Sequence, residues 1–162
     1  MKIAVVYHSQ SGNTKAMAEK VVAGIQRVEG VEAKAFPIEE VDAAYVNESC
    51  CLIAGTPTYN GTMSAKMSAF LEQAPGAFDL KGKIGGAFAT AAYTHGGAEI
   101  AVTGILHHML FCGMMPYSSG NAFGHPVIHY GPTAIAGNLA DFEELFEIYG
   151  ERMANQVKKV FG

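Results

Sequence analysis

Hydroxyl and amide side chains gather directly after the first apolar run of the sequence. Ile3–Tyr7 is apolar throughout, and a short polar loop separates it from a helical pattern. This first loop contains Ser9, Gln10, Ser11, Gly12, Asn13 and Thr14. Its hydroxyls, together with the unpaired N–H groups and the positive dipole end of the following helix, are suited to hold a phosphate group. No basic side chain lies within the loop, so such a site would depend on several neutral donors.

The first loop is neither of the two common nucleotide-binding glycine loops. No GxxxxGK[ST] sequence is present, and only Gly12 stands where GxGxxG requires three glycines. The S-x-S-G-N-T pattern instead resembles the [ST]-x-[ST]-G-x-T loop with which flavodoxin-like proteins hold the phosphate of FMN. The alternative for the loop taken alone is an ordinary capped turn between a strand and a helix.

Two further loops of similar composition follow other apolar runs. The second loop contains Pro57, Thr58, Tyr59, Asn60, Gly61, Thr62 and Met63. The third loop contains Thr90, Ala91, Ala92, Tyr93, Thr94, His95, Gly96 and Gly97. Because parallel strands bring their carboxyl ends to one edge of a sheet, we expect the three loops to form the walls of one ligand pocket.

Three blocks of sequence extend the resemblance to the WrbA-like NAD(P)H:quinone oxidoreductases. These blocks are GTPTYNGTM, ATAAYTHGGAE and HYGPTAIAG. The resemblance implies that FMN is bound by the three loops and by Tyr130, with Tyr59 and Tyr93 against the flavin and Asn60-Gly61 beside its N5 atom. Without the resemblance, Asn60-Gly61 is a tight turn and each tyrosine is an ordinary packing residue.

No catalytic residue is assigned from the sequence, because a bound flavin would carry the chemistry itself. His95 and Tyr93 are the candidates for a supporting role at the flavin, although a loop histidine such as His95 is equally suited to face solvent. No CxxC, HExxH or cluster of histidines and carboxylates occurs, so no metal site is predicted.

Apolar runs alternate with helical patterns five times along the chain. We predict an α/β, flavodoxin-like, three-layer doubly wound fold with a five-stranded parallel sheet, in the order 2-1-3-4-5 that the resemblance implies. The expected strands are 3–7, 31–36, 49–55, 83–92 and 114–117, and the expected helices are 13–27, 38–46, 64–73, 98–111 and 141–161. Residues 118–138 are rich in glycine and proline and are expected to be irregular.

Length and charge set broad limits on function. The 162 residues predict a single FMN-binding domain spanning 1–162. The net charge of −4 gives no electrostatic reason to expect binding to nucleic acid or to an anionic membrane surface. No apolar run is long enough to span a membrane. Three cysteines do not make a disulfide framework, so we expect a reducing, cytoplasmic location.

The resemblance implies an oxidoreductase that moves hydride from NAD(P)H through FMN to a quinone or a similar small-molecule acceptor. Three features depart from that family: Phe111-Cys112 replace a His-His pair, Leu106 replaces a tryptophan, and the 117–130 region is shorter. The alternative is a flavodoxin-type carrier that exchanges electrons with a redox protein, and a sensory flavin module is a third possibility. The mild net charge favours the enzyme, because carriers usually present a strongly acidic face.

Helix 98–111 is expected to be apolar on nearly all sides. Such a helix is either buried in the core or packed on another subunit. Together with the tetramers of the resembling family, this pattern predicts a homodimer or a homotetramer.

Overall fold

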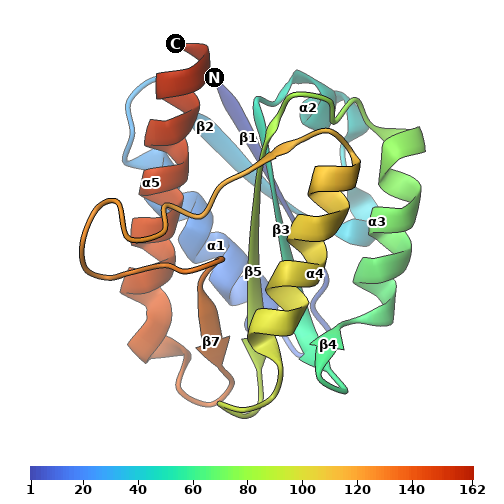
Figure 1. The fold of residues 1–162 in the computed structure, drawn as a ribbon, viewed down its shortest axis with the longest axis vertical. Helices are drawn as coiled ribbons and strands as arrows, with labels where there is room; N and C mark the ends of the chain where they lie inside the picture. The colour runs from blue at the N-terminus through green and yellow to red at the C-terminus, as the bar shows by residue number, and fades with distance from the viewer.

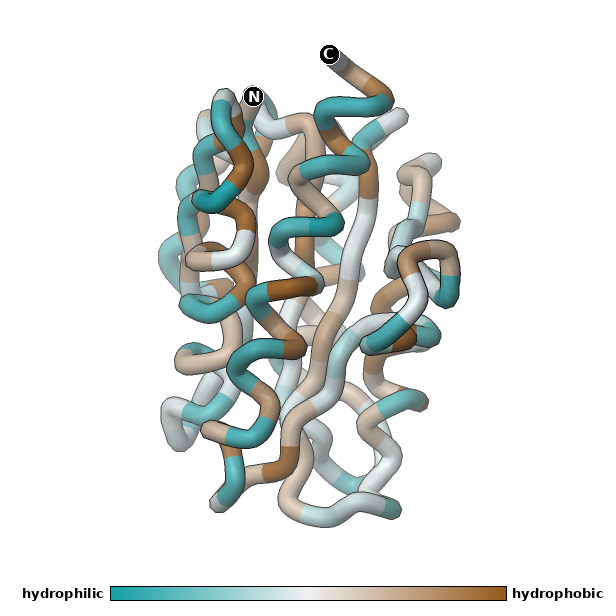
Figure 2. The backbone as a smooth tube through the Cα atoms, turned by 90° about the vertical axis from the view of Figure 1, so that its left-hand side faces the viewer, coloured by the Kyte–Doolittle hydropathy of each residue, from teal (hydrophilic) through white to brown (hydrophobic).

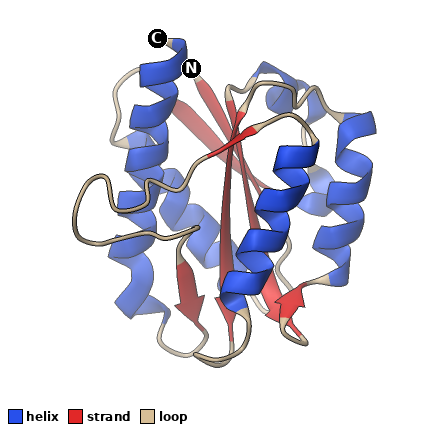
Figure 3. Ribbon diagram, in the orientation of Figure 1, coloured by secondary structure: helices blue, strands red, loops and turns tan.

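The structure is a computed structural model that describes all residues, 1–162. One central sheet is covered by helices on both faces (Figures 1 and 3). The strands are β1 Lys2–Tyr7, β2 Glu32–Pro37, β3 Cys51–Tyr59, β4 Thr62–Met63, β5 Ile84–Ala91, β6 Met115–Pro116 and β7 Thr133–Ile135. The helices are α1 Asn13–Gln26, α2 Ala43–Glu48, α3 Ala65–Ala77, α4 Ala98–Phe111 and α5 Glu143–Phe161, with short 3₁₀ turns η1 Ile38–Glu40 and η2 Leu139–Phe142.

The main sheet has the predicted parallel order. Its strands run β2-β1-β3-β5-β6, which is the order 2-1-3-4-5 when strands are numbered as the sequence predicts them. Strand β5 is buried along its whole length, as a strand covered on both faces must be. Figure 2 shows the consequence: the helices alternate between hydrophilic and hydrophobic residues, whereas the central strands carry few hydrophilic ones.

Two apolar cores lie on opposite faces of the sheet. Helices α1 and α5 cover one core, with Met17 and Phe146 fully buried in it. Helices α3 and α4 cover the other, with Met67 and Ile105 fully buried and α2 at its edge. This three-layer arrangement leaves the two ends of the strands free of helices, and the carboxyl ends point downward in Figure 1.

The predicted fifth strand differs from the observed one. Only Met115–Pro116 pairs with the start of β5, and a separate strand, β7, pairs in parallel with the end of β5. The expectation that all of 118–138 is irregular was therefore wrong for 133–135. Three residues flanked by Pro132 and Gly137 give no strand signal of their own, and β7 forms because its residues meet the exposed edge of β5.

The second loop is more ordered than predicted. Strand β3 continues to Tyr59, and β4 returns antiparallel to it, with Tyr59 opposite Thr62. The φ angles of Asn60 and Gly61 are 52° and 81°, which match a two-residue hairpin turn with positive φ at both positions. The tight-turn interpretation of Asn60-Gly61 is confirmed, and the loop boundary placed at residue 56 was too early.

Residues 117–132 leave the sheet between β6 and β7 and lie beside α5 at mid-height in Figure 1. Arg152 of α5 fixes this segment by donating from Nη1 to the carbonyl of Pro126 at 2.8 Å and by lying 5.5 Å from the ring centre of Phe123. None of the helices has the length and apolar character needed to cross a bilayer.

Candidate functional site

The three loops meet at the carboxyl ends of the strands and enclose a cleft. Its larger part has a volume of about 580 Å³ and is lined by Gln10, Thr58, Tyr59, Asn60, Gly61, Ala91, Ala92, Tyr93 and Gly96. A smaller part of about 170 Å³ is lined by Ser11, Asn13, Pro57, Thr58, Tyr59, Thr90, Ala91, Ala92 and Ala136. The two parts share four residues and so form one continuous cleft, of a size typical for small-molecule sites.

The first loop offers unused hydrogen-bond donors at the end of the cleft. Helix α1 starts after Gly12 without any side-chain cap. Ser9 Oγ accepts the N–H of Lys15 at 3.2 Å, whereas the N–H groups of Gly12, Asn13 and Thr14 have no partner within the protein. Such N–H groups, aligned with the helix dipole, attract an anion.

Direct contacts join the loops to one another. Thr14 and Thr90 share a buried hydroxyl–hydroxyl hydrogen bond of 2.8 Å, which ties the first loop to the end of β5. Tyr59 donates its hydroxyl to Gln10 Oε1 at 3.2 Å, which ties the hairpin to the first loop. These bonds fix the walls of the cleft relative to each other.

The third loop contacts the hairpin through Gly97. A Cβ atom at Gly97 would lie 2.3 Å from the carbonyl oxygen of Gly61, and the φ angle of Gly97 is +90°. Both the backbone conformation and the close approach therefore require glycine at this position.

One buried hydroxyl in the cleft has no partner. Thr58 Oγ1 is shielded from solvent and makes no hydrogen bond, although Thr58 lines both parts of the cleft. An unsatisfied buried polar group is costly and calls for an explanation. A ligand with a polar edge in the cleft would satisfy it.

The donor set suits a ligand with one anionic end and one flat end. Neutral donors surround the first-loop end, and no lysine, arginine or histidine lines the cleft. Tyr59 lines both parts of the cleft and Tyr93 lines the larger part; their rings, 39% and 77% exposed, are available to a planar ring system. The residues present therefore fit a flavin mononucleotide.

Most of the predicted site residues come together in the cleft, but several do not line it. Thr14 is buried beside Thr90, while Thr94 and His95 are exposed at the tip of the third loop. Tyr130 lies away from the cleft, before β7, and lines a separate hollow of about 140 Å³ with Glu99 and His129. Other predicted residues outside the lining are Ser9, Gly12, Thr62, Met63 and Gly97.

Sequence reasoning missed two residues at the site. Ala136 lines the smaller part of the cleft because β7 runs beside the end of β5. His8 is only 6% exposed, and its Nδ1 lies 2.8 Å from Ser64 Oγ, directly beneath the hairpin that carries Tyr59. The position of His8 between the first strand and the first loop was the available signal.

Comparisons with known proteins agree with this architecture. The flavodoxin family model matches residues 5–113. A flavodoxin of Clostridium saccharobutylicum is 38% identical over 161 residues, covering 99% of this chain and all of that protein. An NAD(P)H dehydrogenase (quinone) of Cupriavidus metallidurans is 32% identical over 201 aligned positions, covering 99% of each.

Among solved structures, a flavodoxin described as WrbA-like from Agrobacterium tumefaciens has a TM-score of 0.77 and 24% identity, and covers 98% of both chains. The fold is therefore shared with that protein. Since both the family match and the full-length relatives extend over the three loops that build the cleft, this chain belongs to the flavodoxin family.

Proposed function

We propose that the cleft binds FMN and that the protein is an electron carrier of the flavodoxin type, which exchanges electrons with a redox protein. Membership of the family implies a flavin cofactor. A bound flavin supplies the redox chemistry, and the protein supplies binding, orientation and electrostatics.

The first loop would hold the phosphate of FMN. The N–H groups of Gly12, Asn13 and Thr14 are free at the uncapped start of α1, and Ser11 and Asn13 line the adjoining part of the cleft. Charge-assisted hydrogen bonds from several neutral donors replace the missing basic side chain.

The hairpin and the third loop would hold the ring system. Thr58, whose Oγ1 has no hydrogen-bond partner, lines the cleft, and Tyr59 and Tyr93 offer flat apolar faces. Exposure of Tyr93 leaves this end of the cleft open to a partner.

The observation that carries the choice of a carrier is the absence of any charged side chain along the cleft. A nicotinamide dinucleotide brings a diphosphate, which proteins commonly bind with basic side chains. The first loop would be occupied by FMN, and no charged side chain lines the cleft to bind that diphosphate. Residues 117–132, held against α5 by Arg152, do not supply one either.

A quinone reductase that uses NAD(P)H is the second candidate, and its support comes from relatives. Full-length similarity to an NAD(P)H dehydrogenase (quinone) favours it, although that alignment spans 201 positions against 162 residues here. A second copy of the chain could complete the missing nicotinamide site. Exposed Ile100, Leu110 and Phe111 on α4 are apolar groups with which a homo-oligomer would form.

One paired experiment separates the two candidates. The protein loaded with FMN is titrated with dithionite at controlled potential, and its NADH and NADPH oxidation is measured with and without benzoquinone. We expect two resolved one-electron steps and negligible benzoquinone-dependent oxidation. A single two-electron step with rapid turnover would assign the protein to the reductases instead.

A further inference from the structure

His8 occupies an unusual place for a histidine in this fold. It is the first residue after β1, and its N–H continues the β1–β3 pairing by donating to the carbonyl of Gly55 at 3.1 Å. Its side chain is buried and contacts the base of the hairpin, not the cleft. The function proposed above does not use this side chain.

The base of the hairpin is closed by Thr56 and Ser64. The N–H of Ser64 donates to Thr56 Oγ1 at 3.1 Å, directly below the pairs Thr58–Met63 and Tyr59–Thr62. Ser64 is also the N-cap of α3, where its Oγ accepts the N–H of Met67 at 3.2 Å. Ser64 therefore fixes the hairpin and the start of α3 together.

His8 attaches this base to β1 and the first loop. Its Nδ1 lies 2.8 Å from Ser64 Oγ, and that hydroxyl can donate to the Nδ1 of a neutral imidazole while it accepts the N–H of Met67. Burial lowers the pKa of His8 and so favours the neutral ring, while Glu39 of η1 acts in the opposite direction and Lys66 of α3 adds to the lowering.

The same side chain also contacts the aromatic wall of the cleft. The rings of His8 and Tyr59 meet edge to face with centres 6.4 Å apart. Gln10, two residues further along, accepts a hydrogen bond from the Tyr59 hydroxyl at its Oε1. Tyr59 is thus held at two points by residues on either side of Ser9.

We propose that His8 is a positioning residue, which holds the hairpin and thereby Tyr59 in the orientation that binds the flavin ring. The proposal rests on FMN binding as the proposed function of the cleft. His8 touches neither the lining of the cleft nor its first-loop donors, so it acts only through Ser64 and Tyr59.

The test uses a matched pair of variants, His8→Leu and His8→Asn. Leucine and asparagine both branch at Cγ into two δ atoms, and both remove the ring contact with Tyr59. Only asparagine keeps a hydrogen-bonding atom where Nδ1 meets Ser64 Oγ. The difference between the two variants therefore isolates this one hydrogen bond.

Two readouts are compared for wild type and both variants. The first is FMN affinity together with quenching of flavin fluorescence, and the second is amide hydrogen exchange of residues 58–64 in the protein without FMN. We expect His8→Leu to bind FMN roughly 5- to 10-fold more weakly with less quenching, and its hairpin amides to exchange roughly 10-fold faster. His8→Asn should recover most of both losses.

Equal FMN affinity and equal hairpin exchange in His8→Leu and wild type would overturn the positioning role, as would a failure of asparagine to rescue. Wild-type protein that binds no FMN would instead overturn the proposed function. In that case the exchange of the hairpin amides still decides whether His8 holds the hairpin.

Discussion

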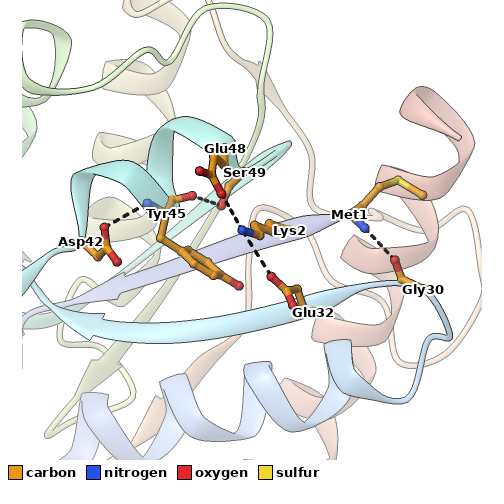
Figure 4. A network of polar contacts seen from close by, with 8 residues as sticks. All are labelled: Met1, Lys2, Gly30, Glu32, Asp42, Tyr45, Glu48 and Ser49. Carbon is orange, nitrogen blue, oxygen red and sulfur yellow. Dashed lines mark hydrogen bonds and ion pairs between the residues drawn. The ribbon is translucent and has the colours of Figure 1, made fainter.

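At the amino end of the sheet the polar groups pair with one another, whereas at the carboxyl end many of them remain free. Figure 4 shows the amino end: Lys2 Nζ lies 2.5 Å from Glu48 and 3.7 Å from Glu32, and the terminal ammonium of Met1 donates to the carbonyl of Gly30 at 2.7 Å. The carboxyl end has uncapped N–H groups and no charged residue lining its cleft.

Each end also contains one buried hydroxyl without a partner, Tyr45 at the amino end and Thr58 at the carboxyl end. Tyr45 is packed between Phe36 and the ammonium groups of Lys2 and Lys34, and it does not line the hollow beside Lys2 and Glu32. Thr58 lines a cleft. An unpaired hydroxyl therefore indicates a ligand only where there is room for one.

The largest effect on FMN affinity is expected from a substitution at Gly97, where the third loop touches the hairpin. Gly97→Ala places a methyl group against the carbonyl of Gly61, so FMN affinity should fall by at least about 100-fold as the two walls move apart. Gly82→Ala is the matched control, because Gly82 also has a positive φ but nothing lies within 4 Å of its added Cβ. It should cost about 1 kcal/mol of stability and leave FMN affinity unchanged, as measured by thermal melts and flavin fluorescence.

The next largest effect on FMN affinity is expected from removing the unpaired hydroxyl of Thr58, in contrast to that of Tyr45. Thr58→Val should leave the stability of the FMN-free protein unchanged but weaken FMN binding by about 10-fold, because the ligand loses a hydrogen bond. Tyr45→Phe removes the other unpaired hydroxyl and should not alter FMN binding. Equal affinities in both variants, measured by isothermal titration calorimetry, would show that Thr58 does not contact the ligand.

The two ends should also respond to opposite extremes of pH. The folded-state pKa of His8 is lowered by burial from 6.5, so the unfolded chain takes up a proton first and stability falls as pH drops below about 6.5. Burial raises the pKa of Tyr45 to about 12 from 10.0, so its contribution is present below pH 10 and is lost as pH rises toward 12. Urea unfolding across pH should show that His8→Asn reduces the acid loss only and that Tyr45→Phe reduces the alkaline loss only.

The smallest effect is expected from the exposed ion pairs. Lys2→Met removes both contacts with Glu48 and Glu32, whose side chains are largely exposed, and should shift Tm by no more than about 2 °C. The shift should shrink further in high salt, because salt screens exposed charges. A large, salt-independent loss of Tm would mean that the amino end depends on this network more than the exposure of its charges implies.

The sequence was sufficient to predict what depends on local pattern. The apolar runs at β1, β3 and β5, the helices between them and the first loop follow from residues that are neighbours in the chain. Strand β7 could not be predicted, because three residues beside Pro132 acquire their conformation only by pairing with β5.

The site shows the same limit. The partners His8–Ser64 and Thr14–Thr90 are 56 and 76 residues apart, and nothing in their local sequence specifies these hydrogen bonds. Tyr130 shows a further difference. The resemblance to a family motif predicts it at the cofactor, whereas in the structure it lies before β7 and lines a different hollow.

The central claim is that the free donors of the first loop hold a phosphate and that the rest of the cleft holds a flat ring. Titration of the FMN-free protein with FMN and with riboflavin, followed by flavin fluorescence, tests it directly. Tight 1:1 binding of FMN, with riboflavin bound at least about 100-fold more weakly, is the predicted result, because riboflavin lacks the phosphate that the uncapped N–H groups of α1 attract. Equal affinity for the two flavins, or no binding of either, would contradict the claim.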